Sequence, residues 1–465
     1  MPGRVWFTAA LLLVSYSGIL AVGSHWFGPD TVVIEMPVWP LVIFLCAAGG
    51  SYLCLCVVLL RTAEPVPSGS VVVLIATAGL FARLVLLASE PTIEIDYLRY
   101  LWDGGVTAAG FNPYQTAPDN ILKLPIEHAL QQLAKEAGPI FTSIGHAQLT
   151  TIYPPLAQAA FVLAHWMQPW SLEAWRFVIL IFDIATLILL LRLLHVLAAP
   201  LTWSAIYWWN PLVLKELFNS AHMDVLITPF ILLALLAAYR SKPLLATMAI
   251  CAAAGVKVWP VVLLPLVWRQ ILLEPRKLAL TIAAAIVCIG LLALPYWFAG
   301  LERDAGIVAY SSSWRISAPL YGLIEIAIAA VTPDVWPAPL VARLLVGLLV
   351  VGLVLFLICR QSFNQQDLLP GVIAIVAAII FLSPAVYPWY VTWLLPLLAL
   401  RPQFPLLLLT ATAPLYYTRF YYGARETYEI FELYIVWCLW VPVWIFCVWQ
   451  WLRPQSGAWL NTQQR

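Results

Sequence analysis

"VWPLVIFLCAAGGSYLCLCVVLL", residues 38–60, contains no charged residue. A helix of about 20 apolar residues is long enough to cross the hydrocarbon core of a bilayer, and similar runs recur along nearly the whole chain. Of the 465 residues, 63% are hydrophobic and 10% are charged, and the mean hydropathy is +0.90. Charged residues make up about 25% of an ordinary soluble domain. The sequence therefore predicts an all-α polytopic membrane protein.

We expect a bundle of about 12 membrane spans that forms a single integral membrane domain over residues 1–465. Two further apolar stretches do not fit as simple spans, because 155–168 is short and "AAGVKVWP" divides 243–268 into two half-length pieces. We predict that both are re-entrant or interfacial helices. The expected spans lie near residues 6–23, 38–60, 70–88, 175–198, 200–214, 222–239, 277–299, 337–359, 368–383, 387–400, 403–418 and 430–452.

The basic residues predict which side of the membrane each loop occupies, because short cytoplasmic loops collect Lys and Arg. With the N-terminus in the cytoplasm, the inner segments hold 12 basic residues against three acids, provided that both short stretches enter and leave by one face. We therefore expect both termini in the cytoplasm and the long loop 89–154 on the outer face of the cell inner (plasma) membrane. The inner basic residues are Arg4, Arg61, Arg192, Arg240, Lys242, Arg269, Arg276, Lys277, Arg360, Arg401, Arg453 and Arg465.

Composition and motifs exclude several functional classes. The net charge of +1 argues against a nucleic-acid partner. No glycine-rich pattern typical of nucleotide binding is present, and the eight cysteines have no metal-ligand spacing. The polar motifs instead gather in segments expected on the outer face, so an active site would face away from the cytoplasm.

The outer loop 89–154 contains "EIDYLRYLWDGG", residues 94–105, near its start. On a helix, Asp96, Arg99, Tyr100 and Asp103 are spaced i, i+3, i+4 and i+7 and share one face, which predicts an amphipathic helix at the membrane interface. These charges could form a self-neutralising surface network. Alternatively, Glu94 or Asp96 could act as a general base toward an acceptor hydroxyl, or hold a divalent cation (Mg²⁺ or Mn²⁺) against a phosphate.

Five polar and aromatic stretches follow one another along the chain. They are "EIDYLRYLWDGGVTAAGFNPYQTAPD" (94–119), "TIYPPLAQ" (151–158), "NPLVLKELFNSAHMD" (210–224), "GVKVWPVVLLP" (255–265) and "SPAVYPWYVTWLLPLL" (383–398). In this order they resemble a family of bacterial membrane glycosyltransferases, over roughly residues 90 to 425. The family belongs to the GT-C superfamily and is often described as polyprenol-phosphate-mannose-dependent mannosyltransferases.

The resemblance implies a GT-C-like helical bundle, a large first outer loop with an acidic motif, and a lipid-phosphate sugar donor. Relatives often carry adjacent acids before the Tyr-Arg-Tyr run. Here Ile95 separates Glu94 from Asp96, and Leu98 separates Tyr97 from Arg99. We therefore rank the candidate bases as Asp96 first, then Glu94, then Asp103.

Basic residues near these motifs are candidates for binding the donor phosphate. Lys257 lies in an apolar run, where a charge is costly and suggests function, although it could instead snorkel to an interface. His222 and Lys215 could contact the phosphate or belong to an interfacial cap at the start of a span. Arg315 and Arg419 could pair with a phosphate or be surface charges. Asp183, within a span, is expected to pair with Arg176.

Nine further residues are expected to bind substrate. Tyr153, Tyr387 and Trp389 could stack under a sugar ring, although Tyr and Trp also favour membrane interfaces. Asp224 would orient a neighbouring group. The complete set is Arg99, Tyr100, Asn112, Tyr114, Tyr153, Asn219, Asp224, Tyr387 and Trp389.

These features together predict a glycosyltransferase. It would move a hexose, with mannose expected first, from a polyprenyl-phosphate donor to a hydroxyl of a lipid-linked or cell-envelope glycan on the outer face. One alternative is a transporter or flippase of lipid-linked saccharides. Another is a glycan polymerase or ligase that uses a lipid-diphosphate donor, and a third is a catalytically inactive subunit.

Overall fold

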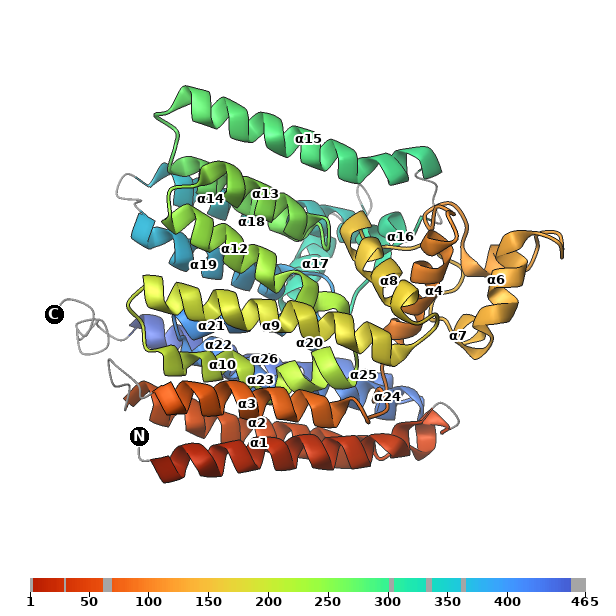
Figure 1. Cartoon of the computed structure of the whole chain (residues 1–465), viewed down its shortest axis with the longest axis horizontal. Coiled ribbons are helices and arrows are strands. Elements are labelled where there is room, and N and C mark those ends of the chain that lie inside the picture. The colour runs from red at the N-terminus through yellow and green to blue at the C-terminus, as the bar shows by residue number, and fades with distance from the viewer. Residues whose placement is uncertain are drawn as a thin grey trace.

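The computed structural model describes residues 3–28, 31–61, 69–300, 305–331, 337–360 and 365–452 (Figure 1). Helices and short connections make up these segments. The β-type pairing within them is an isolated bridge between Ile316 and Ala385. The all-α class predicted from the sequence is confirmed for this part of the chain.

Eight of the described helical segments are long and apolar enough to cross a membrane. Figure 1 shows the long helices running side by side along one direction. They are α1 (Gly3–Ser24, continued by a turn to Phe27), α2 (Val38–Arg61), α3 (Gly69–Leu86), α9 (Leu172–Val196), α15 (Pro275–Ala299), α18 (Ala338–Cys359), α19 (Leu368–Leu382, entered from Gln365) and α26 (Val436–Leu452, entered from Tyr428).

The expected count of about 12 spans is not confirmed. The segments expected at 200–214 and 222–239 contribute to a bent pair, Pro211–Asn219 and Met223–Tyr239, whose two halves meet at 106°. If this pair is one broken span, the described residues contain up to nine spans. The segments expected at 387–400 and 403–418 are divided into short helices: α20 (Pro388–Val391), α21 (Leu395–Leu400), α22 (Phe404–Leu407) and α23 (Leu409–Thr412). Proline lies in the first turn of α20, α21 and α22, where its fixed φ favours a new helix start.

The two stretches expected to be re-entrant or interfacial form short helices. Residues 155–167 make α8 (Pro155–Met167), and 243–269 make α13 (Pro243–Ala254) and α14 (Leu264–Arg269) with a break between them. The carbonyl of Gly255, at that break, accepts hydrogen bonds from the backbone amides of Leu156 and Ala157 at the start of α8. A Cβ at Gly255 would lie 3.1 Å from the Leu156 side chain, so glycine permits this close approach. Their position in the membrane stays a prediction.

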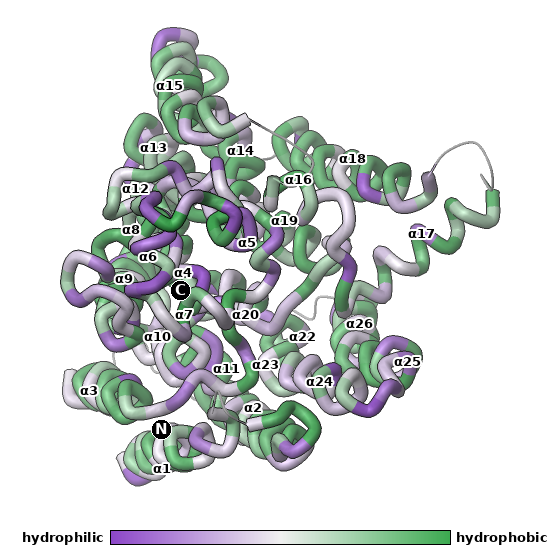
Figure 2. The backbone as a smooth tube through the Cα atoms, turned by 90° about the vertical axis from the view of Figure 1, so that its right-hand side faces the viewer, coloured by the Kyte–Doolittle hydropathy of each residue, from purple (hydrophilic) through white to green (hydrophobic). Residues whose placement is uncertain are grey.

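The loop 89–154 folds over one end of the bundle. It contains α4 (Asp96–Ala108), α5 (Pro118–Ile121), α6 (Ala129–Ala137) and α7 (Pro139–Thr142). Figure 2 looks onto this end, where hydrophilic residues gather around α4, α5 and α6, whereas the outlying α15 and α18 are mostly hydrophobic. The loop has its own small apolar core, made of Trp102, Val106, Ile121, Leu130, Ala134, Ala137, Phe141 and Ile144.

Helix α4 is buried along most of its length rather than on one face alone. A Cβ at Gly104 would lie 2.6 Å from the Phe161 carbonyl oxygen, so α4 packs directly against the backbone of α8. Burial of α4 fixes the position of Asp96, its first residue.

The intramembrane Asp183 pairs with Arg83 of α3 and not with Arg176, so that prediction is wrong. The Arg83 Nε lies 2.6 Å from the Asp183 carboxylate, and both side chains are fully buried. Tyr207 donates a further hydrogen bond of 2.6 Å to Asp183. Arg176, seven residues before Asp183 on the same helix, instead donates to the carbonyls of Ser89 and Asn219, each at 2.7 Å.

The variant Asp183→Leu should lower the apparent Tm in detergent by several degrees, because it leaves Arg83 as an unpaired buried charge. Breaking a buried pair costs about 3–5 kcal/mol, whereas replacing both partners by apolar residues is often neutral. The double variant Arg83→Met with Asp183→Leu should therefore recover most of the Tm. An unchanged Tm in the single variant would contradict a stabilising role for this pair.

Candidate active site

Titratable side chains from distant parts of the chain meet where the loop 89–154 covers the bundle. The segments that supply them are the start of α4, the break in the bent pair, and the break between α13 and α14. We call this group the polar cluster, and its members are Glu94, Asp96, Lys215, Glu216, His222, Asp224 and Lys257.

The break in the bent pair supplies four members of the cluster. A π-helical turn, Leu214–Asn219, follows the short α11 (Pro211–Val213), and the chain leaves helical geometry before Met223. π-Helical turns are rare in proteins, and those that do occur are often found at functional sites. Ala221, immediately before His222, has φ of +57°, which is strained for a residue with a Cβ. A continuous helix would direct these four side chains to different faces, whereas the break turns them all inward.

Neighbouring side chains bind the irregular backbone at the break. Trp175 donates to the carbonyl of Ala221 at 2.8 Å, and Arg176 donates to the carbonyl of Asn219. The Asn219 side chain donates to the Glu90 carbonyl at 2.7 Å and accepts from Thr92. Backbone polar groups within a membrane need such protein partners. These bonds also tie the start of the outer loop to the broken span, so Asn219 has a structural role here.

Glu94 and Asp96 enter the cluster from the end of that tied segment. The preceding Ile93 has φ of +68°, an unfavourable value for a β-branched residue that is often associated with functional sites. Glu94 is buried, and its Oε1 has no hydrogen-bond partner among the described residues. By contrast, 39% of the surface of the Asp96 side chain is exposed. Of the two carboxylates, Asp96 is therefore the one open to a substrate.

The two carboxylates differ in their pKa values. Burial raises the pKa of Glu94 to about 8, and the negative charge of Asp96 adds to this effect, while Lys215 and Arg419 oppose it. Burial also raises the pKa of Asp96 to about 6, although the positive charge of Lys257 lowers it in part. At pH 7 Asp96 is therefore mostly ionised and Glu94 mostly protonated.

Lys257 is the partly exposed cation of the cluster. Its Nζ donates to Asp224 at 2.7 Å, and 22% of its side chain is exposed. The ammonium lies 4.2 Å from the ring centre of Tyr390 and 4.7 Å from that of Trp393, which stabilises its charge. Trp393 also donates to Asp224 at 2.6 Å and fixes that carboxylate.

Lys215 and Glu216 are fully buried and bonded within the protein. The Lys215 Nζ donates to Ser220 at 2.8 Å, contacts the hydroxyl of Tyr417, and lies 3.7 Å from Glu216. Tyr417 donates to both carboxylate oxygens of Glu216, at 2.7 and 2.8 Å. Lys215 is thus placed to balance the charge of Glu216, and its buried position does not suit the expected contact with a phosphate.

His222 is also fully buried, between Asp96 and Glu216. Its Nδ1 lies 3.8 Å from Asp96 and its Nε2 lies 3.7 Å from Glu216. The imidazole stacks on Trp389 with ring centres 3.8 Å apart, and Trp389 stacks on Tyr387 at 4.5 Å. Two of the expected aromatic residues, Tyr387 and Trp389, therefore lie beside the cluster, and Trp389 packs on His222 there.

Several other candidates have partners that point to packing. Arg99 and Asp103 form an ion pair of 2.9 Å within α4; Arg99 also donates to the Leu149 carbonyl, and Asp103 accepts from Gln158. Tyr100 is buried and stacks on Phe161. These contacts fix α4 on α8, so Asp103 is a weaker candidate base than Asp96.

The remaining candidates lie around the cluster. Asn112 donates to the Pro295 carbonyl at 2.8 Å, and Tyr114 donates to the Tyr153 carbonyl at 2.7 Å. Arg419 donates to Tyr416 at 2.5 Å, and its charge acts on Glu94 and Asp96. Arg315 is 51% exposed and lies 3.4 Å from Glu325, which suits a surface pair. Substrate contacts by these residues stay predictions.

A metal ion would find few ligands in this cluster. Across the part of the chain that the structure describes, no group of three or more His, Cys, Asp or Glu side chains is arranged to hold a metal ion. Glu94 and Asp96 provide two carboxylates, whereas Mg²⁺ keeps near-octahedral oxygen coordination. A cation bound there would need oxygens from a substrate phosphate and from water.

Sequence reasoning missed three contributors to the site. Glu216 stands in a quoted motif but was not proposed for chemistry, and its partner Tyr417 is 201 residues away. Trp393 reaches Asp224 across 169 residues. Periodicity carries no signal for such contacts, although an acid beside a lysine in an apolar stretch could have drawn attention to Glu216.

Comparison with known proteins identifies the family. A family model described as alpha-(1->6)-mannopyranosyltransferase, N-terminal domain (MptA_B family), matches residues 6–274, more than half of the chain. No curated protein and no solved structure matches the chain. The predicted resemblance to GT-C-like mannosyltransferases is thereby confirmed. The chain belongs to the alpha-(1->6)-mannopyranosyltransferase family, and its apolar helices make it a multi-pass membrane glycosyltransferase.

Proposed function

We propose that this protein transfers a mannosyl group from a polyprenyl-phosphate donor to the hydroxyl of a lipid-linked or cell-envelope glycan, with Asp96 as general base. The observation that carries the proposal is the pairing of a partly exposed carboxylate, Asp96, with a partly exposed ammonium, Lys257, in one polar cluster. The carboxylate would act on the acceptor hydroxyl, and the ammonium would act on the donor phosphate.

The proposed reaction is a single displacement at the anomeric carbon of the mannosyl group. Asp96 takes the proton of the acceptor hydroxyl, the acceptor oxygen forms a bond to the anomeric carbon, and the bond from that carbon to the phosphate oxygen breaks. The electron pair leaves with the polyprenyl phosphate. The name of the family specifies an alpha-(1->6) linkage, so inversion would require a β-linked mannosyl donor and a 6-hydroxyl acceptor.

Lys257 would neutralise the charge that develops on the leaving phosphate. Its platform of Tyr390 and Trp393 and its bond to Asp224 hold the ammonium in place before substrate binds. Preorganised charges of this kind stabilise transition states because they need little rearrangement during the reaction. Arg419, partly buried and electrostatically coupled to Asp96, is a second candidate for contact with the phosphate.

An apolar cavity beside Lys257 suits the prenyl tail of the donor. It has a volume of about 190 Å³, and Val256, adjacent to Lys257, is part of its wall. An apolar cavity of about 150 Å³ accommodates benzene, a molecule of about the same size as one isoprene unit. The other lining residues are Leu156, Ala159, Ala160, Leu163, Phe182, Leu226 and Phe230.

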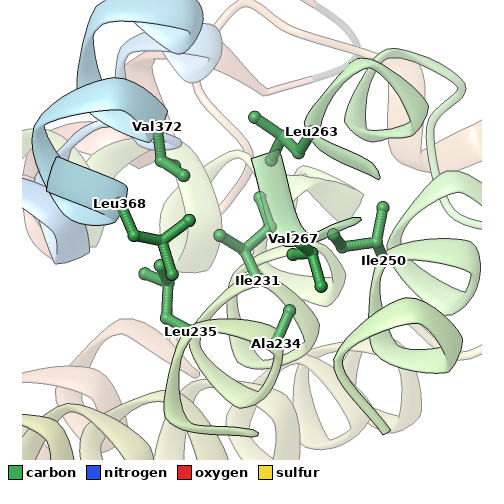
Figure 3. Close-up of a pocket in the computed structure, with 8 residues that line it drawn as sticks. All are labelled: Ile231, Ala234, Leu235, Ile250, Leu263, Val267, Leu368 and Val372. Carbon is green, nitrogen blue, oxygen red and sulfur yellow. The ribbon is translucent and has the colours of Figure 1, made fainter. Parts of the chain in front are cut away.

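A second cavity, shown in Figure 3, lies among α12 (Thr228–Tyr239), α13, α14 and α19. Its volume is about 10 Å³, and all eight lining residues are apolar. A space of this size holds at most about one water molecule. It is a packing void, so the cavity beside Lys257 is the better candidate for a lipid chain.

The proposed orientation puts the site on the outer face of the membrane. The positive-inside rule supports it, because the inner segments carry the excess of Lys and Arg. In Figure 1, α1 begins at the opposite end of the bundle from α4 and α6. An N-terminus in the cytoplasm would then leave the polar cluster on the outer side.

Asp96→Asn should lower the rate of mannosyl transfer by roughly 100- to 10,000-fold, the usual contribution of a general base. The assay uses protein in nanodiscs with polyprenyl-phosphate-[¹⁴C]mannose and follows both release of polyprenyl phosphate and label transfer to a lipid extract. Asp119→Asn, which changes an exposed carboxylate of the same loop, should transfer at the wild-type rate. Wild-type transfer by Asp96→Asn would move the base to Glu94.

Lys257→Ala should raise the KM for the donor by about tenfold to a hundredfold, because a hydrogen bond to a charged group contributes about 1.5–3 kcal/mol. Lys123→Ala, an exposed lysine of the outer loop, is the matched control and should leave the KM unchanged. If donor KM is unaffected by Lys257→Ala, Lys257 does not bind the phosphate.

A further inference from the structure

The position of His222 is unexplained by the proposed transfer reaction alone. Both ring nitrogens are buried and have no hydrogen-bond partner among the described residues. An unsatisfied buried polar group is costly, and buried nitrogens of this kind are uncommon in native proteins. On either side of the ring stands a carboxylate, Asp96 toward Nδ1 and Glu216 toward Nε2.

The surroundings restrict how the imidazole can move. Trp389 covers one face at 3.8 Å with an angle of 21° between the ring planes, so small displacements along the plane are the easiest. The gaps to the two carboxylates, 3.8 and 3.7 Å, exceed hydrogen-bond length by less than 1 Å. Catalytic hydrogen bonds are often long before substrate binds and shorten in the complex.

Glu216 is held in a fixed position on the far side of the ring. Tyr417 donates to both of its oxygens, and Lys215 balances its charge. An ionised Glu216 favours the tautomer of the neutral imidazole that carries its N–H on Nε2. That tautomer leaves the lone pair of Nδ1 directed toward Asp96.

We propose that Asp96, His222 and Glu216 form a proton-accepting array in which His222 takes the proton that Asp96 removes from the acceptor hydroxyl. This inference rests on the proposed function and assigns His222 a positioning and proton-accepting role behind the base. The proton moves from the acceptor oxygen to Asp96 and then to Nδ1 of His222. The resulting imidazolium lies between two carboxylates, and the proton returns through Asp96, the exposed member, when product leaves.

Charges on the neighbouring elements couple this array to the donor. Burial disfavours a positive charge on the imidazole of His222, and the charges of Lys215 and Lys257 add to this effect. A donor phosphate bound at Lys257 would offset part of that repulsion and make His222 a better proton acceptor when substrate is present. The charged groups around the array are Asp96 from α4, Lys215 and Glu216 from the π-helical turn, Asp224 from the following turn, and Lys257 from the break after α13.

The variant His222→Asn distinguishes proton transfer from simple packing. The amide keeps a polar group near the position of Nδ1 but does not accept a proton. We expect kcat to fall at least tenfold while the donor KM changes less than twofold. Glu216→Gln, which removes the charge that orients the imidazole, should lower kcat in the same direction. Thermal unfolding and gel filtration of each variant check that it is folded.

The pH profile provides a second readout. Transfer requires ionised Asp96, whose pKa is raised to about 6, so the rate should be full well above pH 6 and fall as the pH drops through it. In the wild type a shared proton on Asp96 and His222 sets this acid limb. Loss of one of the two sites lowers the proton affinity of the pair, so the limb should shift to lower pH in His222→Asn.

Two results separate failure of this inference from failure of the proposed function. If the wild type transfers no mannose from any polyprenyl-phosphate donor, the proposed function itself fails. If the wild type transfers and folded His222→Asn keeps its kcat, or loses kcat with an unchanged acid limb, the proton-accepting role is overturned and the rest of the reaction scheme stands.

Discussion

The interrupted helix between Asn219 and Met223 is the constraint on which the site depends. A 106° bend within an apolar bundle exposes backbone groups that lipid does not satisfy. Trp175 and Arg176 bind two of the carbonyls, and Asn219 uses its side chain to hold the start of the outer loop. The bonds that stabilise the bend therefore also position Glu94 and Asp96. Stability of the fold and geometry of the site have a common origin.

The charged side chains of this site lie in environments that differ in their exposure to solvent. Glu216 and Lys215 are fully enclosed and compensate each other, whereas Asp96 and Lys257 keep part of their side chains exposed. Burial of Glu94 favours its protonated form and leaves Asp96 as the main negative charge facing substrate. Placing two carboxylates in unlike surroundings is a general way to give them separate roles.

Hydropathy predicted the long helices well, because a span of uniform apolar residues such as α2 needs no tertiary information. It failed where prolines restart the chain, as between Pro388 and Leu407, because each piece is apolar yet too short to cross alone. The pairing of Asp183 was also out of reach. A seven-residue spacing suggested Arg176, but the fold brings Arg83 of α3 to Asp183 of α9 across 100 residues.

Motif reading located Asp96, His222, Asp224 and Lys257, which the fold brings together. Their roles were harder to predict, because burial decides them. His222 and Lys215 were expected to contact phosphate, yet each is enclosed. Arg99 and Asp103 share a helical face with Asp96, but their partners come from the loop near Leu149 and from α8. Such long-range contacts leave no periodic trace in one sequence.

A cryo-electron microscopy structure of the protein in nanodiscs with bound polyprenyl phosphate would show which side chains hold the donor phosphate. We expect density for the phosphate within hydrogen-bond distance of the Lys257 Nζ, with the prenyl chain entering the apolar cavity beside Val256 and Asp96 facing the space left for the sugar. Phosphate density bound instead at Arg315, with Lys257 still paired only to Asp224, would contradict this expectation.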